Sequence, residues 1–304
     1  MLFETTCAVI GLGSMGYGMA QSILRANKPV LGIDIDQNRM ADFRAEGGID
    51  SDLKSLAPKL DTAVIVVLNA SQTEAVLFGD DALVPLMSSG AVVISCATVP
   101  PEFARQMAAK CADYGVHYLD APISGGALKA AQGALSVMAS GSDEAFAAAQ
   151  PVLDDIAETV FKLGDKAGAG SAMKAVNQLL AGVHIATMAE ALTFGMTQGV
   201  EPKTFVDVIS KCAGSSWMLE NRAPHIVDGD YTPKSAVNIW LKDLGIVLNI
   251  ANTANFEAPI SKAALAEFTK AADMGLGLED DAAVAKVYAD RAQLTLPFMD
   301  TKNP

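Results

Sequence analysis

The chain has 304 residues, and with about 150 residues per domain as a guide we expect two domains and ample length for a buried core. A share of 51% hydrophobic and 19% charged residues excludes a disordered or low-complexity chain. The formal net charge of −13 would repel phosphate backbones and anionic lipid surfaces, so neither nucleic acid nor membrane is an expected partner.

The cysteines and histidines show no metal-binding spacing, because the sequence has no CxxC and no HxxxH pair. They are Cys7, Cys96, Cys111, Cys212, His117, His184 and His225. The N-terminal residues lack a basic stretch followed by a cleavable apolar one, and the most apolar stretch, 179–189, is about half of a membrane span. We expect no metal site, no transmembrane helix and a reducing cytoplasmic location.

Short apolar runs alternate with helical stretches from residue 7 to residue 164. The runs are AVIGLG, PVLGIDID, TAVIVVL, AVVISCA, HYLDAPI and LSVMASG. Continuous apolar runs between helices are typical of strands that are buried on both faces of a mostly parallel sheet. The pattern predicts a doubly wound α/β domain over residues 1–165.

Helical periodicity replaces this pattern in the rest of the chain. From residue 168 to 199, apolar and small residues recur at spacings of three and four, which predicts one long helix. These positions are Met173, Val176, Leu179, Leu180, Val183, Thr187, Ala191 and Phe194. Further helices are predicted near 202–213, 235–254, 260–274 and 280–292. Residues 166–304 are therefore expected to form an all-α domain for substrate binding and oligomerisation.

A glycine-rich loop follows the first apolar run and precedes a helical stretch. It consists of Gly11, Leu12, Gly13, Ser14, Met15 and Gly16. In this GxGxxG pattern the first glycine permits a tight turn, the second leaves room for a pyrophosphate and the third lets the helix approach the sheet. Backbone N–H groups at the helix start would hold the anion. The pattern predicts a dinucleotide-binding domain of the Rossmann type.

Asp34, eighteen positions after Gly16, ends the second apolar run. Its carboxylate could accept hydrogen bonds from the adenosine ribose and would repel a 2′-phosphate, and Ile35 and Asp36 follow it in place of an arginine. We therefore expect NAD over NADP. The alternative is a glycine loop that binds nothing, with Asp34 as a solvated strand end or a helix cap.

Polar positions after two other strands would lie at the same carboxyl edge of the sheet. Leu68 and Asn69 end the third apolar run, and Thr98 follows the fourth. All three are expected to contact the dinucleotide.

Four ordered motifs resemble the β-hydroxyacid dehydrogenase family. They are VIGLGSMGYGMA (9–20), DAPISGGALKAAQGALSVMASG (120–141), GAGSAMKAVNQ (168–178) and KDLGIVLNIA (242–251). The family includes 3-hydroxyisobutyrate dehydrogenase and tartronate semialdehyde reductase, and 6-phosphogluconate dehydrogenase is a distant relative. The resemblance covers nearly the whole chain and implies a hydride transfer between NAD and a small hydroxy acid.

Lys174 matches the catalytic lysine of the family. Oxidation of a secondary alcohol needs a base within hydrogen-bond reach of the hydroxyl, and burial together with a nearby oxidised nicotinamide and Lys242 would favour the neutral amine. By residue type alone, Lys174 would instead be a solvated helix lysine. The family usually has asparagine four residues later, where this chain has Gln178, one methylene longer. Gln178 is the expected substrate contact, with Asn177 a less favoured one.

The segment from Asp120 to Gly126 resembles the substrate-binding signature of the family. Ser124 and the N–H groups of Gly125 and Gly126 could bind the substrate carboxylate, while a plain glycine turn after a strand is the simpler interpretation. Asp120 is expected to be structural.

The resemblance places Lys242 near nicotinamide and substrate, with Asp243 orienting it; a surface ion pair is the alternative. Trp217 and Asn221 are predicted substrate contacts. Together with Arg222 and His225 they could read a polyhydroxy acid or pack a subunit interface, and these two interpretations have equal weight. His184, in an apolar helical run, is given no role.

Residues 177–186 and 215–237 look most like the family members that oxidise the C2 hydroxyl of the sugar acid L-threonate with NAD. Activity on acids with a three-carbon skeleton, of the 3-hydroxyisobutyrate or tartronate semialdehyde type, is the enzymatic alternative. A non-catalytic NAD-binding module is a further alternative, although related modules lose the lysine that this chain keeps. The resemblance also implies a homodimer or homotetramer.

Overall fold

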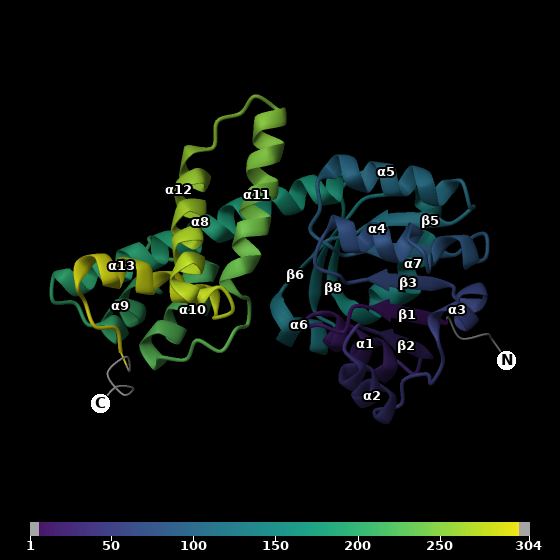
Figure 1. Cartoon of the computed structure of the whole chain (residues 1–304), viewed down its shortest axis with the longest axis horizontal. Helices are drawn as coiled ribbons and strands as arrows, with labels where there is room; N and C mark the ends of the chain where they lie inside the picture. The colour runs from purple at the N-terminus through teal and green to yellow at the C-terminus, as the bar shows by residue number, and fades with distance from the viewer. Residues whose placement is uncertain (1–5, 298–304) are drawn as a thin grey trace. The chain divides into compact units, whose positions relative to one another are not determined.

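The computed structural model describes residues 6–297, and the chain divides into two compact units, Met1–Lys174 and Ala175–Pro304 (Figure 1). The first unit is built on a sheet and the second consists of helices. The boundary predicted after residue 165 precedes helix α8 (Ala169–Thr197), whereas the structural division falls inside this helix.

A five-stranded parallel sheet forms the centre of the first unit. Its strands are β1 (Cys7–Ile10), β2 (Val30–Ile33), β3 (Thr62–Ile65), β4 (Val92–Ser95) and β5 (His117–Asp120). The strand order is β2-β1-β3-β4-β5, and Val9 of β1 is in register with Gly32 on one side and Val64 on the other. All four pairings are parallel, which confirms the predicted fold class.

Both faces of this sheet are buried, since successive side chains of a strand point to opposite faces. In β1, Val9 packs with Met19 of α1 in one core cluster, whereas Ile10 packs with Leu77 of α4 in another. The helices of this unit are α1 (Gly16–Arg25), α2 (Gln37–Ala45), α3 (Leu53–Leu56), η1 (Ala57–Lys59), α4 (Ala70–Phe78), η2 (Val84–Leu86), α5 (Pro101–Ala112), α6 (Gly126–Gln132) and α7 (Asp143–Ile156).

A second, three-stranded sheet has the order β6-β7-β8 and does not continue the parallel pattern. Its strands are β6 (Ile123–Ser124), β7 (Leu135–Ala139) and β8 (Ala157–Lys162). Strand β6 runs antiparallel to β7, and β7 runs parallel to β8. The predicted run HYLDAPI therefore divides between two sheets, with Asp120 bridged to Ser140 at the junction.

The helical unit begins within α8. Its other helices are α9 (Pro202–Ile209), α10 (Trp217–Asp228), α11 (Val237–Thr253), α12 (Pro259–Ala271), η3 (Ala272–Leu276), η4 (Asp281–Val284) and α13 (Ala285–Ala292). The predicted helices are present, and α10 is an additional one that the periodicity did not indicate. Pro224 lies inside α10, where it removes one backbone hydrogen bond, and Ser216 caps the first turn of this helix.

The apolar stripe that predicted α8 does not form the buried face of the helix. Met173 is 45% exposed, Val176 55% and Phe194 66%. The buried positions of the C-terminal part are instead a mixture of small and larger residues, namely Ile185, Ala186, Met188, Ala189 and Leu192. Small side chains allow neighbouring helices to approach closely, and Ala186 and Ala189 share the buried face with Ile185, Met188 and Leu192.

Among residues 6–297, α8 is the one helix whose length and composition would allow it to cross a membrane, with a mean hydropathy of 1.4 over its most apolar window. Its residues Ile185, Ala189 and Leu192 pack in the core of the helical unit. These contacts are those of a core helix in a folded domain.

Gly182 of α8 permits the close approach of α11. A Cβ atom at this position would lie 2.9 Å from Cε3 of Trp240 and 3.0 Å from a methyl group of Leu244. The Trp240 ring cannot move away easily, because it is buried, stacks on Phe268 and donates a hydrogen bond from Nε1 to Asp281.

We predict that Gly182→Ala lowers the free energy of unfolding by about 1–2 kcal/mol, because overpacking at the helix crossing outweighs the better helix propensity of alanine. Gly245→Ala is the matched control, since a Cβ atom at Gly245 of α11 meets nothing within 4 Å. This control should raise the free energy of unfolding by about 0.5–1 kcal/mol. Urea unfolding of both variants measures the difference, and two changes of the same sign would contradict the prediction.

Candidate active site

The glycine-rich loop joins β1 to α1 with the backbone geometry that its glycines were predicted to provide. Gly11 has a φ of +99°, and a Cβ atom on Gly16 would lie 1.8 Å from the carbonyl oxygen of Gly11. A Cβ atom on Gly13, by contrast, meets nothing within 4 Å. The first and third glycines are thus required by the protein itself, while the space beside the second is open at the start of the helix, and binding of a pyrophosphate there stays a prediction. Ser14 is exposed and Leu12 is fully buried.

Asp34 lies directly after β2, beside this loop. One carboxylate oxygen accepts a hydrogen bond from Leu12 N at 2.6 Å, and the other accepts one from Asp36 N at 2.9 Å. The structure thus brings Asp34 and the glycine loop together. Each oxygen retains a second lone pair that can accept a ribose hydroxyl.

Sequence reasoning missed Arg39, whose guanidinium donates to the carbonyl oxygen of Leu12 at 3.3 Å. This residue lies in α2, which Asp36 caps through a hydrogen bond from Asn38 N. The prediction considered only the residues adjacent to Asp34, whereas the helix turns a later side chain back toward the loop. The helix-capping Asp36, followed by the apolar Met40 and Phe43 three residues apart, is the signal that could have found it.

Leu68, Asn69 and Thr98 follow strands of the parallel sheet, as predicted. Asn69 caps α4, because its side-chain oxygen accepts a hydrogen bond from Gln72 N at 2.9 Å. Leu68 is 48% exposed, and its N–H donates to the side chain of Gln72. Thr98 is half-buried between β4 and α5. Part of the hydrogen-bonding capacity of Asn69 therefore serves the helix.

Lys174 lies beside the predicted carboxylate-binding segment. Its amine donates a hydrogen bond to the carbonyl oxygen of Ile123 at 2.8 Å, and the residue is only 8% exposed. Ile123 precedes Ser124 directly, and Gly125 and Gly126 follow with φ of +137° and +79°. Positive φ at both positions explains why glycine occupies them. Lys174 is therefore not a solvated helix lysine.

Asp120 anchors the start of α8 and so determines where Lys174 lies. Its Oδ2 atom accepts hydrogen bonds from Gly168 N at 2.8 Å and Ser171 N at 2.9 Å, and Oδ1 accepts one from the Ser171 hydroxyl at 2.6 Å. Burial raises the pKa of Asp120 above its ordinary value, although the hydrogen bonds from Ser171, Gly168 and Ser140 oppose this rise. The structural role expected for Asp120 is that of a helix cap.

Four residues of the helical unit that the sequence analysis named form a polar cluster. Gln178 donates from Nε2 to Oδ2 of Asp243, and the amine of Lys242 lies 2.9 Å from Oδ1 of Asp243. Asp243 is 2% exposed, so the pair with Lys242 is not the surface ion pair that was the alternative interpretation. Asn177 donates to Oε1 of Gln178 at 2.9 Å.

Trp217 and Asn221 lie one turn apart in α10, where Trp217 is 57% exposed. Arg222 Nε donates to Asp281 at 2.6 Å and its Nη1 donates to Oδ1 of Asn221, and His225 Nδ1 lies 2.9 Å from Asp280. Arg222 and His225 are buried and make these contacts within the helical unit, and substrate contact and subunit interface both stay predictions for this group of residues. His184 is half-buried in α8.

The pKa values of Asp280 and Asp281, the two buried aspartates of this network, are shifted in opposite directions. Burial opposes ionisation of Asp280, but hydrogen bonds from His225 and from the N–H groups of Lys234 and Ala282 lower its pKa below the ordinary value. Burial raises the pKa of Asp281, and the charge of Arg222 opposes this rise. The network connects α10 to η4, which makes it part of the framework of the helical unit.

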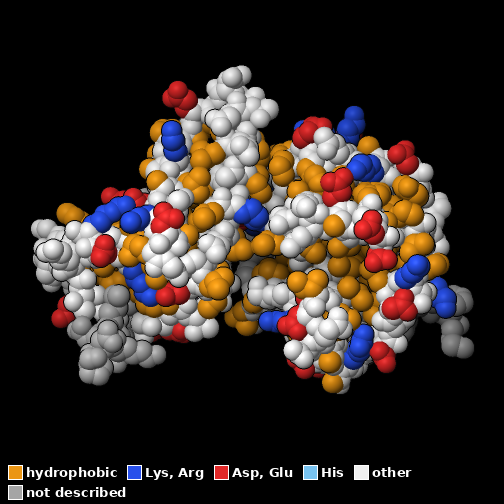
Figure 2. Space-filling view, in the orientation of Figure 1, with side chains coloured by type: hydrophobic (Ala, Val, Ile, Leu, Met, Phe, Trp, Pro, Cys, Tyr) orange, Lys and Arg blue, Asp and Glu red, His pale blue; other side chains and the backbone are white. Residues whose placement is uncertain are grey.

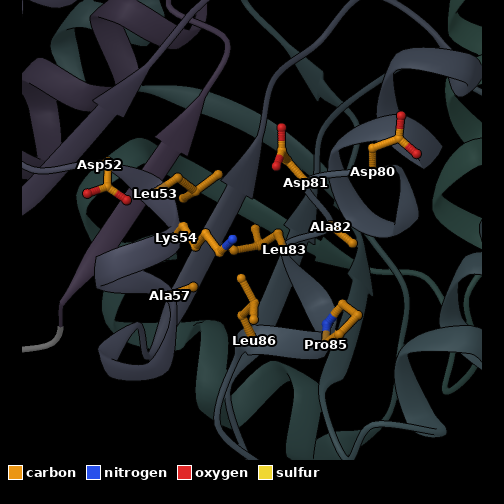
Figure 3. A pocket seen from close by; sticks show the side chains of 10 residues that line it. All are labelled: Asp52, Leu53, Lys54, Ala57, Asp80, Asp81, Ala82, Leu83, Pro85 and Leu86. Carbon is orange, nitrogen blue, oxygen red and sulfur yellow. The ribbon is translucent and has the colours of Figure 1, made fainter.

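A cavity of about 460 Å³ lies elsewhere in the first unit, among α3, η1 and η2 (Figure 3). Its lining combines apolar side chains with carboxylates at the rim, namely Asp52, Leu53, Lys54, Ala57, Asp80, Asp81, Ala82, Leu83, Pro85 and Leu86. None of the predicted site residues lines it.

Two family models match consecutive parts of the chain. The NAD-binding domain of 6-phosphogluconate dehydrogenase matches residues 6–164, and the NAD-binding domain of NADP-dependent 3-hydroxyisobutyrate dehydrogenase matches residues 168–288. The chain belongs to the β-hydroxyacid dehydrogenase family. It is accordingly an NAD-binding oxidoreductase that acts on CH–OH groups.

Individual relatives cover almost the whole chain. It is 48% identical over 281 residues to L-threonate dehydrogenase of Cupriavidus necator, covering 92% of this chain and 95% of that one. It is 43% identical to the enzyme of the same name from Escherichia coli K12, covering 97% of each. The crystal structure of 3-hydroxyisobutyrate dehydrogenase from Salmonella typhimurium is 44% identical, with a TM-score of 0.89 over 93% of this chain and 100% of that one.

The raised pKa of Asp120 predicts a pH-dependent stability difference between the wild type and Asp120→Asn. A carboxyl group with a raised pKa binds its proton more tightly in the folded state, so its contribution to stability is lost as the pH rises from about 4 through the folded pKa. Asparagine does not titrate, and the cost of its altered hydrogen bonds does not depend on pH.

The stability advantage of the wild type over Asp120→Asn should therefore shrink as the pH rises, by about 1.4 kcal/mol per unit of raised pKa. Urea unfolding at a series of pH values from 4 to 8 measures this change. An advantage that grows with pH would mean that the surrounding N–H and hydroxyl donors outweigh the burial of the carboxylate.

Proposed function

We propose that the protein oxidises the C2 hydroxyl of L-threonate to 2-oxo-tetronate with NAD, by hydride transfer with Lys174 as the base. The observation that carries this proposal is the buried Lys174 amine, held 2.8 Å from the Ile123 carbonyl oxygen and next to Ser124, Gly125 and Gly126. The identity of 48% to a protein named L-threonate dehydrogenase supports the choice of substrate.

Lys174 accepts the hydroxyl proton of the substrate in this mechanism. Its hydrogen bond to the Ile123 carbonyl oxygen uses one N–H and fixes the nitrogen, so that the lone pair of the neutral amine can be directed at the substrate oxygen. When bound, NAD supplies the acceptor for the hydride that leaves C2, the carbon that carries this hydroxyl. In the reverse direction the ammonium form of Lys174 returns the proton.

Substrate recognition is assigned to Ser124, Gly125, Gly126, Gln178, Trp217 and Asn221. The hydroxyl of Ser124 and the N–H groups of Gly125 and Gly126 bind the carboxylate, because the two glycines present no Cβ atom to the ligand. Gln178 lies one turn after Lys174 on α8 and binds a substrate hydroxyl. Trp217 and Asn221 contribute the shape and hydrogen bonds that a polyhydroxy acid needs.

We assign the cofactor to residues 11–16, with additional contacts from Leu68, Asn69 and Thr98, and we propose Lys242 as a further cofactor contact. Asp34 supports a preference for NAD over NADP, because its carboxylate beside the loop accepts ribose hydroxyls and repels a 2′-phosphate. Arg39 reduces this repulsion, yet its guanidinium is already bonded to the Leu12 carbonyl oxygen.

A homodimer or homotetramer is proposed from the exposed apolar residues of the helical unit, of which Figure 2 shows one face. The stripe of Val176, Leu180 and Phe194 on α8 would bury these side chains against a second copy. Sedimentation of the purified chain at micromolar concentration tests this, and a monomer would contradict it. A reducing compartment, the cytoplasm, fits the four free cysteines.

Activity on hydroxy acids with a three-carbon skeleton is the second candidate, and the likeness to 3-hydroxyisobutyrate dehydrogenase from Salmonella typhimurium favours it. A non-catalytic NAD-binding module is the least favoured, because it would have no use for a buried lysine beside the carboxylate-binding segment.

We predict that Lys174→Ala lowers kcat by about 10²–10⁴-fold, because the hydroxyl proton then has no base, while the Kd for NAD changes little. Lys166→Ala is the matched control, since Lys166 is an exposed lysine shortly before α8, and it should keep wild-type kcat. Stopped-flow measurement of NADH formation and fluorescence titration of the dinucleotide give the two quantities. Substantial residual turnover in Lys174→Ala would remove the base role.

We further predict that L-threonate with NAD gives the highest kcat/KM in a panel of hydroxy acids, exceeding that of 3-hydroxyisobutyrate by about tenfold or more. The extra hydroxyl groups of the sugar acid pair with polar groups that a shorter acid leaves unpaired. Each acid is assayed with saturating NAD and with saturating NADP. A higher kcat/KM for 3-hydroxyisobutyrate would contradict the substrate assignment. A preference for NADP would contradict the proposal that Asp34 selects NAD.

A further inference from the structure

Two polar residues face each other at the crossing of α8 and α11, among apolar side chains. Gln178 is 7% exposed and Asp243 2% exposed. Their neighbours along the two helices include Gly182, Trp240 and Leu244, which form the close contact described above. An amide and a carboxylate in such surroundings must satisfy each other, because a buried polar group without a hydrogen-bond partner destabilises the fold.

The hydrogen bonds fix the orientation of the Gln178 amide. A carboxylate only accepts hydrogen bonds, so the amide nitrogen of Gln178 must face Oδ2 of Asp243. The amide oxygen then faces Asn177, whose Nδ2 donates to it at 2.9 Å. The amide is held at both ends, and neither a flip nor a rotation preserves both contacts.

Asp243 has a second oxygen that faces a cation. The amine of Lys242 lies 2.9 Å from Oδ1, and among residues 6–297 this buried oxygen accepts no hydrogen bond. The pair with Lys242 is therefore an ion pair that balances the buried charge, while the directed hydrogen bond of Asp243 goes to Gln178.

We propose that Asp243 is a positioning residue for substrate binding: it fixes the side-chain amide of Gln178, together with Asn177, so that Gln178 presents one remaining N–H and one remaining lone pair to a substrate hydroxyl. This inference rests on the proposed substrate contact of Gln178. A glutamine has one more rotatable bond than an asparagine. The two hydrogen bonds of the Gln178 amide, to Asp243 and from Asn177, form what we call the clamp. The clamp removes the rotamer freedom that would otherwise weaken the contact of Gln178 with the substrate.

The clamp determines which chemical groups the site accepts. A hydroxyl can donate to the lone pair of the amide oxygen and accept from the amide N–H at the same time, whereas a methyl group can do neither. A substrate with a methyl group in this place leaves both amide positions unpaired in a buried site. The clamped amide thus selects hydroxylated acids over apolar ones through the cost of unpaired groups.

A double-mutant cycle tests whether Asp243 acts through Gln178. The variants are Gln178→Met, Asp243→Leu and the double variant, assayed with the hydroxy acid that gives wild type its highest kcat/KM. Each single variant should raise KM about tenfold and lower kcat less, and the double variant should also raise KM about tenfold. A rise of about a hundredfold in the double variant would mean independent effects and would overturn the proposal.

Asp243→Asn provides the rescue. Its side-chain oxygen still accepts from Gln178, so KM should stay within about threefold of wild type; a KM as high as that of Asp243→Leu would overturn the proposal as well. If Asp243→Leu does not fold, the KM of Asp243→Asn still tests the proposal. Thermal unfolding and the Kd for NAD report whether each variant is folded. The cycle uses whichever hydroxy acid gives the highest kcat/KM. If L-threonate is not turned over but another acid is, the proposed function is wrong. The role of Asp243 is then still tested by the cycle on that other acid.

Discussion

The carboxylate of Asp120 is the contact on which the arrangement of the first unit depends. It lies at the end of β5 and accepts hydrogen bonds from Gly168 N, Ser171 N and the Ser171 hydroxyl, which are the donors that the first turn of α8 would otherwise leave unsatisfied. Lys174 comes three residues after Ser171. A capped helix start at the sheet edge therefore holds the lysine at the Ile123 carbonyl oxygen, next to the glycines at 125 and 126.

The helical unit uses buried charges in a different manner. Arg222, Asp281 and Trp240 form one set of hydrogen bonds, and His225 and Asp280 form another. Charges that are removed from water must be paired closely, and such pairs favour one packing arrangement over others. The same principle applies to Asp243, except that one of its partners is an amide on the helix that also carries Lys174.

Local pattern predicted most of the fold because its signals come from neighbours in the chain. Buried strands need continuous apolar runs, and the loop after β1 needs glycine where φ is positive at Gly11 and where Gly16 touches the Gly11 carbonyl oxygen. The same patterns gave the five parallel strands and the long helix, and they missed α10, whose internal Pro224 argues locally against a helix. The split of residues 117–123 between two sheets depends on pairing with the distant strand β7, which a local pattern does not contain.

The sequence by itself determined that a dinucleotide loop, a lysine and an amide stand in a fixed order along the chain, since glycine spacing and helical period are properties of consecutive residues. Tertiary structure alone decided which side of α8 is buried, where Arg39 lies and which atoms Asp243, Arg222 and His225 contact. Those outcomes depend on shape and desolvation between segments far apart in sequence. In α8 the larger apolar side chains at Val176 and Phe194 stayed exposed, while the closely packed crossing formed at Gly182.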